Sequence, residues 1–248
     1  MSVLTSITSA FASLVEQLAD LVQPVFHGSA TAVAIILFTA LVRLAVHPLS
    51  RAAARGQKAR ARLAPQVAEL RRKHGKNPER LQKAVMELHA REKVSPLSGC
   101  LPSLMQAPAF VLLYHLFTGG SLGGEFLGAP LGGRWADALG DGGVFGAAGL
   151  VYVALFAIVG AVATFTYVRT RRQLAAGGPG AQAAQAELPG MAAVTNVLPL
   201  LSFATLVTVA VVPLAAALYV VTSTTWSAVE RVFLYRDMPA AGALATAG

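Results

Sequence analysis

The sequence predicts an all-α polytopic membrane protein with five transmembrane helices and a cytoplasmic antiparallel helical hairpin. Of its 248 residues, 55% are hydrophobic and 13% are charged, whereas soluble domains carry about 25% charged residues. Apolar runs of about 18 or more residues are long enough to cross a bilayer. Five such runs occur, at residues 30–49, 100–118, 145–168, 194–212 and 213–234.

The N-terminal segment, residues 1–29, precedes the first apolar run and is amphipathic. Leucines such as Leu14 and Leu18 fall on one side of a helix, and Glu16 and Asp20 fall on another. The segment lacks the positive start of a secretory signal peptide. We therefore expect an extracytoplasmic helix that lies in the membrane interface.

The distribution of basic residues predicts the orientation of the chain in the membrane. Between Arg51 and Lys93 there are thirteen Lys and Arg residues and four Glu, a net charge of +9, while the whole chain carries +8. Basic loops stay in the cytoplasm, so the N-terminus is predicted outside and the C-terminus inside.

The expected regions are 1–29, a first transmembrane helix over 30–50, a cytoplasmic segment over 51–95, the remaining spans over 96–236 and a short cytoplasmic tail over 237–248. Pro213 separates the fourth span from the fifth.

The basic segment 51–95 has the pattern of two paired helices. Apolar residues recur at helical spacing in two short series, Leu63, Val67 and Leu70, and then Leu81, Val85 and Leu88. Between them Gly75 suits a helix end, Asn77 an N-cap and Pro78 a first helical position. The two series predict an antiparallel hairpin.

The charge of this hairpin has two interpretations. It is a solvated face that sets topology, or it binds anionic lipid head groups, an acidic protein or RNA phosphates. The contact candidates are Arg60, Arg62, Arg71, Arg72, Lys73 and Lys76.

No motif predicts an enzyme, a metal site or a cofactor. The five histidines are too far apart for ligand spacing, and no nucleophile elbow or phosphate loop is present. Cys100 is the single cysteine, which excludes an internal disulfide.

Arg43 lies inside the first apolar run. A charge at the centre of a membrane helix costs roughly 2.5–3.5 kcal/mol on insertion scales. The presence of Arg43 there therefore needs an explanation, either a polar partner or a function. Snorkelling toward the interface and a functional role both account for it. Gln106 poses the same question, because a buried amide needs partners on both its oxygen and its nitrogen.

Two groups of motifs show a resemblance to a known protein family. The stretch LVRLAVHPLS around Arg43, the basic hairpin and the stretch VSPLSGCLPSLMQAP at 94–108 together resemble the YidC/Oxa family of membrane protein insertases. Ser95 replaces the family's usual Asn. A second stretch, PLAAALYVVTS at 213–223, resembles the family's last-span signature, with Val220 at the usual Trp position.

The resemblance implies a groove that holds polar segments of a client protein while its hydrophobic helix enters lipid. The family's groove arginine corresponds to Arg43, and the expected groove residues are Arg43, Gln106, Thr164, Asn196, Tyr219 and Thr222. The resemblance also implies that the clients are nascent membrane proteins and that the protein lies in a bacterial plasma membrane. Further partners implied are the ribosome, the signal recognition particle receptor, the Sec translocon and anionic lipid.

The sequence leaves two alternative functions open. A small-solute or ion transporter could use Arg43 as a counter-charge, although no internal repeat supports it. A structural protein that tethers ribosomes or lipid would not require Arg43.

Overall fold

The computed structural model describes residues 3–74, 77–92, 123–175 and 198–236. The predicted second span at 100–118 and the 94–108 motif lie outside the described residues. Two compact units are present: Met1–Val46, Gln106–Tyr167 and Leu200–Glu230 form the first, and His47–Met105, Val168–Pro199 and Arg231–Gly248 form the second.

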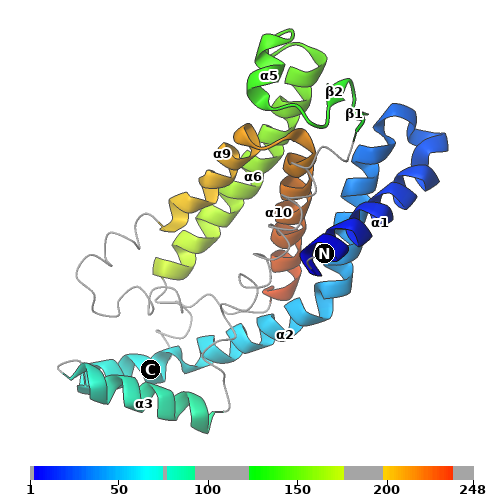
Figure 1. The fold of residues 1–248 in the computed structure, drawn as a ribbon. Coiled ribbons are helices and arrows are strands. Elements are labelled where there is room, and N and C mark those ends of the chain that lie inside the picture. Colours follow the sequence, from blue (N-terminus) through cyan, green and yellow to red (C-terminus); the bar gives the residue numbers. More distant parts are fainter. Residues whose placement is uncertain (1–2, 75–76, 93–122, 176–197, 237–248) are drawn as a thin grey trace. The chain divides into compact units, whose positions relative to one another are not determined.

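Helices dominate the described residues (Figure 1). In chain order the elements are α1 (Val3–Phe26), η1 (His27–Ser29), α2 (Ala30–His74), α3 (Pro78–Arg91), β1 (Glu125–Phe126), β2 (Ala129–Pro130), α5 (Trp135–Gly140), α6 (Ala147–Ala175), η2 (Leu198–Phe203), α9 (Ala204–Val211) and α10 (Leu214–Leu234).

Two helical stretches in the described part of the chain are long and apolar enough to cross a membrane. They are Ala12–Leu63, which includes the predicted span 30–49, and Ala147–Arg172, which covers most of the predicted span 145–168. Pro199–Val211 is a shorter apolar helix. α10 is 21 residues long, enough to cross about 30 Å of hydrocarbon, but its middle stretch, residues 222–227, is rich in Ser and Thr. As predicted, Pro213 lies in the break between α9 and α10.

The helix α1 has three different faces. Val15 is buried in the core of the first unit, and Ala12 and Ala19 pack beside it at the i, i+3, i+7 spacing of one helix face. Leu21 and Val25 are exposed and lie on a second face, while acidic and polar residues occupy the third. The predicted amphipathic helix is therefore present, and one of its apolar faces packs on protein.

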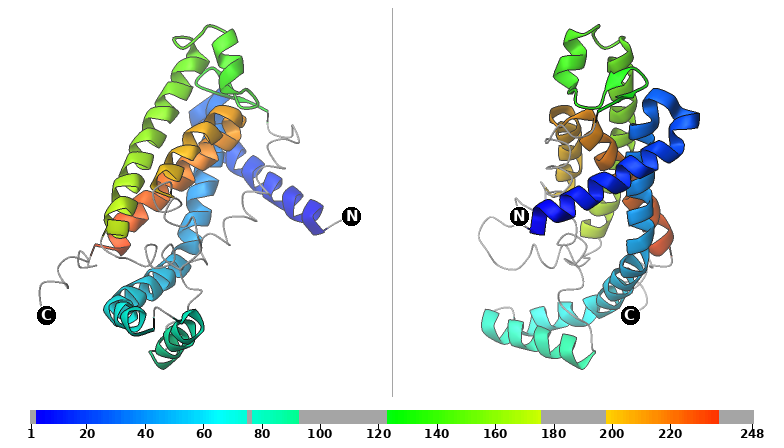
Figure 2. Two further views of the ribbon diagram at one scale, coloured as in Figure 1. Left: turned by 90° about the vertical axis from the view of Figure 1, so that its left-hand side faces the viewer. Right: turned by 45° about the vertical axis from the view of Figure 1, so that its right-hand side comes forward.

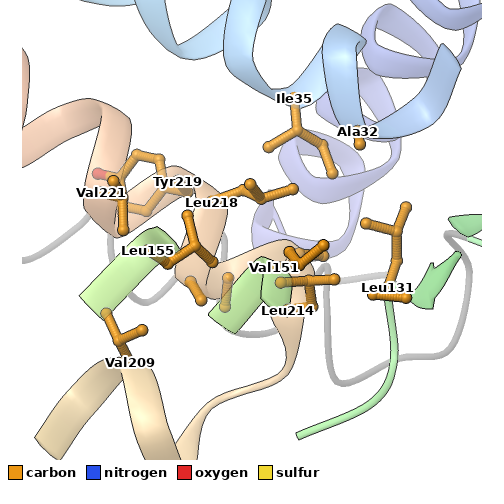
Figure 3. Packing of buried hydrophobic residues seen from close by; sticks show 14 of the residues in the cluster. Ala32, Ile35, Leu131, Val151, Leu155, Val209, Leu214, Leu218, Tyr219 and Val221 are labelled. Atoms are coloured by element: carbon orange, nitrogen blue, oxygen red, sulfur yellow. The ribbon is translucent and has the colours of Figure 1, made fainter. Parts of the chain in front are cut away.

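Most of the core of the first unit comes from α2, α6 and α10 (Figure 3). α6 contributes a stripe at helical spacing that includes Val151, Leu155 and Val159. The first turns of α10 contribute Leu214 and three consecutive alanines, all buried. Small side chains permit close helix packing where lipid replaces water as solvent.

Residues 123–140, between the predicted spans at 100–118 and 145–168, contain a small β hairpin and a short helix. β1 and β2 pair antiparallel, with Phe126 opposite Ala129. The two residues between them, Leu127 and Gly128, have φ of 52° and 83°, which is the type I′ turn that matches strand twist. This small hairpin and the short helix α5 are additions to the all-α architecture that the sequence predicts.

The loop after β2 binds the first turn of α10. The backbone N–H groups of Leu214 and Ala215 donate to the carbonyls of Gly133 and Leu131 at 2.8 and 3.0 Å. These amides have no partner within their own helix. The buried Tyr152 of α6 also donates its hydroxyl to Gly133 O, at 2.7 Å, and its ring packs edge-on against Trp135. Gly133 thus joins α6 to α10.

In the second unit α3 lies beside the last turns of α2 (Figures 1 and 2). α2 continues through Pro48 and Pro65 and ends at His74. Asn77 caps α3 by accepting a hydrogen bond from Arg80 N, with Pro78 in the first turn, so the predicted start of the second helix is confirmed. Leu63 and Val67 are buried, as expected for residues that face a partner helix.

The Gly133 contact predicts a stability effect. Tyr152→Phe removes one of two hydrogen bonds to Gly133 O, a net loss of about 1 kcal/mol, and should lower the melting temperature by about 2–4 °C. Thermal unfolding in detergent measures the shift. Thr164→Val is the control, because the Thr164 hydroxyl bonds only Gly160 O of its own helix among the contacts described. An unchanged melting temperature for Tyr152→Phe contradicts the proposed role of the tyrosine hydroxyl.

Candidate functional site

Helical spacing places Arg43 on the inward side of α2. Ala32, Ile35 and Thr39 are buried and follow one another at intervals of three and four residues. Arg43 is the next position of the same stripe and is partly buried. Its neighbour Leu44 is 58% exposed and lies on a different face. The guanidinium group is therefore directed toward the protein, while the residues beside Arg43 are available to lipid.

The partner of Arg43 comes from the other end of the chain. Ser223 is 2% exposed and lies one turn after the buried Tyr219 on α10. The Arg43 Nη2 group donates a hydrogen bond to Ser223 Oγ. Ser223 and Thr39 are the two buried polar residues in the described part of the first unit. One polar contact thus joins α2 and α10 within an apolar core.

The chemistry of this contact leaves the charge in place. A serine hydroxyl is neutral, so this bond satisfies one guanidinium donor without neutralising the cation. Low local dielectric strengthens electrostatic attraction between such a cation and an anion. The bond to Ser223 therefore does not by itself remove the attraction of the Arg43 cation for a carboxylate.

The composition of α10 changes sharply next to this contact. Residues 214–221 are apolar and mostly buried, whereas residues 222–227 read TSTTWS. Thr224 and Ser227 donate hydrogen bonds to carbonyls of their own helix. Thr225 Oγ1 and Trp226 Nε1 are buried and have no partner among the described contacts. Unpaired buried polar atoms cost about 1–3 kcal/mol each, so the stretch 222–227 suits water or a polar ligand better than lipid.

The predicted groove residues are distributed as follows. Tyr219 belongs to the buried core beside Leu218 and Val221 (Figure 3). Thr222 is partly buried on α10, next to Ser223. Thr164 is exposed on α6. Gln106 and Asn196 lie outside the described residues. Tyr219 and Thr222 thus belong to the same helix as Ser223, the residue that accepts a hydrogen bond from Arg43.

Three of the six hairpin cations predicted as contacts have described side chains. Arg62, Arg72 and Lys73 are exposed on α2. Arg60 and Arg71 belong to the same helix, with side chains outside the description, and Lys76 is not described. Two exposed cations that were not among the candidates, Arg51 and Arg55, share a helix face with Arg62. They form a basic stripe that begins directly after the first apolar run.

Ser223 is the residue that sequence reasoning missed as a site residue. Its hydroxyl was one of many in the spans, and for any single one a bond to its own helix is the ordinary expectation. Two signals pointed to it: its spacing of four residues from Tyr219, and its place where α10 turns from apolar to polar. Neither signal indicates which helix faces it.

A comparison with protein families identifies the chain. A model of the family described as 60Kd inner membrane protein matches residues 22–241. The chain belongs to this family. The match covers nearly the whole sequence and confirms the resemblance to the YidC/Oxa insertases. The chain is thus a mainly helical member of a family of membrane proteins.

Curated relatives carry the same family signal over shorter stretches. The membrane protein insertase YidC of Clostridium perfringens is 40% identical over 92 residues, which are 37% of this chain and 39% of that protein. The YidC of Methylobacillus flagellatus is 40% identical over 98 residues, 40% of this chain and 17% of that protein. The YidC of Alkalilimnicola ehrlichii is 44% identical over 82 residues, which are 33% of this chain and 15% of that protein. The matches therefore span less than half the length of these relatives.

The contact between Arg43 and Ser223 predicts thermodynamic coupling. A hydrogen bond to a charged group contributes about 1.5–3 kcal/mol, so Arg43→Leu and Ser223→Ala should each destabilise the protein. The double variant should lose less than the sum of the two, because both changes remove one interaction. Unfolding in detergent measures all four proteins.

Two control variants accompany this cycle. Ser223→Thr keeps a hydroxyl and should retain most of the coupling. Ser227→Ala removes a hydroxyl that donates to the carbonyl of Ser223 in its own helix, and it should show no coupling to Arg43→Leu. Additive effects of Arg43→Leu and Ser223→Ala contradict a direct interaction.

Proposed function

We propose that the protein is an insertase and chaperone for small membrane proteins in the plasma membrane of a bacterium. The family match and the relatives named membrane protein insertase support the class of activity. The observation that carries the proposal for this chain is the polar contact of Arg43 with Ser223 between otherwise apolar helices.

The proposed architecture has five transmembrane helices around a groove open to the cytoplasm and to lipid. α2 and α6 supply the first and third, η2 with α9 supplies the fourth and α10 the fifth. The second is the span predicted from the sequence at residues 100–118, which lies outside the described residues. The apolar first half of α10 closes the groove, and the polar stretch 222–227 lines it. Gln106, Thr164 and Asn196 complete the proposed lining.

The mechanism follows from the cost of moving polar groups through hydrocarbon. A hydrated groove shortens the apolar distance that a polar client tail must cross. Arg43 attracts acidic residues of that tail, and the exposed apolar residues of α2 and α6 face the lipid that receives the client's hydrophobic helix. Burial of that helix supplies about 0.8 kcal/mol per CH₂, so no nucleotide is required.

The cytoplasmic hairpin, residues 51–95, receives clients before transfer. Its exposed cations suit anionic lipid head groups and the phosphates of ribosomal RNA. The ribosome, the signal recognition particle receptor and the Sec translocon are the proposed protein partners, and the protein acts alone or beside the translocon.

Arg43→Ala is the central test of this function. The purified variant in proteoliposomes should insert a single-span client with an acidic N-terminal tail at least tenfold more slowly than the original protein, since a tenfold change corresponds to about 1.4 kcal/mol. Protease protection of the tail measures insertion. Arg43→Lys keeps the charge and should restore part of the rate.

A client with a neutral tail is the matched control for this experiment. It should depend less on Arg43, because the attraction acts on the carboxylates. Equal insertion of the acidic client by the original protein and by Arg43→Ala, at equal reconstitution, contradicts the groove mechanism.

The proposed orientation predicts thiol accessibility. Cys100→Ser removes the one cysteine, and single cysteines are then placed at the exposed positions Ser13, Lys83 and Asp141. In intact cells a membrane-impermeant maleimide should label the cysteines at 13 and 141, and the cysteine at 83 only after permeabilisation. Labelling of position 83 in intact cells contradicts the orientation.

A further inference from the structure

Tyr235 connects three helices in the second unit. It follows the last residue of α10, and its hydroxyl donates a hydrogen bond to Gln57 Oε1 on α2. The guanidinium of Arg169 on α6 lies over its ring, with Cζ 5.1 Å from the ring centroid. Gln57 and Tyr235 are 178 residues apart in the sequence.

The two contacts use different parts of the tyrosine. The hydroxyl is required for the bond to Gln57, and the π face for the attraction to Arg169. All three side chains are partly buried, so water competes with both contacts less than it does at an open surface. A phenylalanine at position 235 could keep only the second contact, and an aliphatic residue could keep neither.

The position of this cluster relates it to the cytoplasmic hairpin. Gln57 lies about two turns beyond the first apolar run, which ends at Leu49. Arg169 is near the end of the candidate span Ala147–Arg172. Tyr235 follows the end of α10. The three residues therefore mark the places where three helices leave the predicted membrane region on the same side.

We propose that Tyr235 is a positioning residue that fixes the base of the cytoplasmic hairpin to the ends of α6 and α10. This inference rests on the proposed function, in which the hairpin receives clients. Without the two contacts the hairpin base is held by the continuation of α2 and by its remaining packing. A client bound to it then reaches the groove less often in the correct orientation.

Hydrogen–deuterium exchange of the full-length protein in proteoliposomes tests the hydrogen bond. Tyr235→Phe and Gln57→Leu should each speed exchange of the amides in residues 51–62 by about fivefold, as expected for loss of one net hydrogen bond that limits local opening. The double variant should match the single variants, because both changes remove the same bond. Gln57→Glu keeps an acceptor oxygen and should retain protection.

The cation contact has its own matched pair of variants. Arg169→Gln removes the cation over the ring and should also speed exchange in residues 51–62. Arg172→Gln removes a cation from the same end of α6, where the side chain is exposed, and should leave exchange unchanged. Amides of α1 serve as the internal reference in every variant. Unchanged exchange at 51–62 in Tyr235→Phe, Gln57→Leu and Arg169→Gln overturns the proposal.

Client insertion by the same proteoliposomes links the contact to transfer. Tyr235→Phe should slow insertion severalfold for acidic-tailed and neutral-tailed clients alike, whereas Arg43→Ala affects mainly the acidic client. Faster exchange with unchanged insertion overturns the role of Tyr235 in transfer and leaves the insertase function standing. Absence of insertion by the original protein overturns the proposed function, while the exchange data still decide whether Tyr235 holds the hairpin.

Discussion

The hydrogen bond between Arg43 and Ser223 is the interaction on which the candidate site depends. Hydrocarbon offers no partner to a guanidinium group, so the chain must supply one or admit water. α2 and α10 meet through an apolar core that ends at this bond. On the N-terminal side the alanines of α10 pack closely, and around Ser223 the stretch 222–227 is rich in Ser and Thr. The bond therefore lies where the closely packed apolar start of α10 meets the stretch rich in Ser and Thr.

The same demand for satisfied polar groups explains the contacts at the helix ends. The first amides of α10 have no partner in their own helix, and the carbonyls of Leu131 and Gly133 accept their hydrogen bonds. In the second unit, Tyr235 offers a hydroxyl to Gln57 and a π face to Arg169. Aromatic side chains with a polar atom suit such positions, because one end packs and the other bonds.

Prediction from the sequence succeeded where the signal is local. The start of α3 follows from Asn77 and Pro78, whose side-chain and ring properties act within one turn. The break between α9 and α10 follows from Pro213 in the same way. The β hairpin after Gly124 was missed, because its strands are two residues long and its turn places Leu127 at a positive φ that leucine seldom adopts. The groove was predicted by resemblance, and Ser223 was missed because many hydroxyls share its local context.

The sequence by itself determined that the chain is a helical membrane protein of the YidC/Oxa family, since long apolar runs and the 94–108 motif are properties of consecutive residues. It also showed that Arg43 is costly where it lies, because the cost of a charge in hydrocarbon is independent of the fold. Only the tertiary structure decided that the partner is Ser223 and that Gln57, Arg169 and Tyr235 meet. Those pairings join positions far apart in the chain, and helical periodicity specifies which face a residue occupies but not which helix lies opposite it.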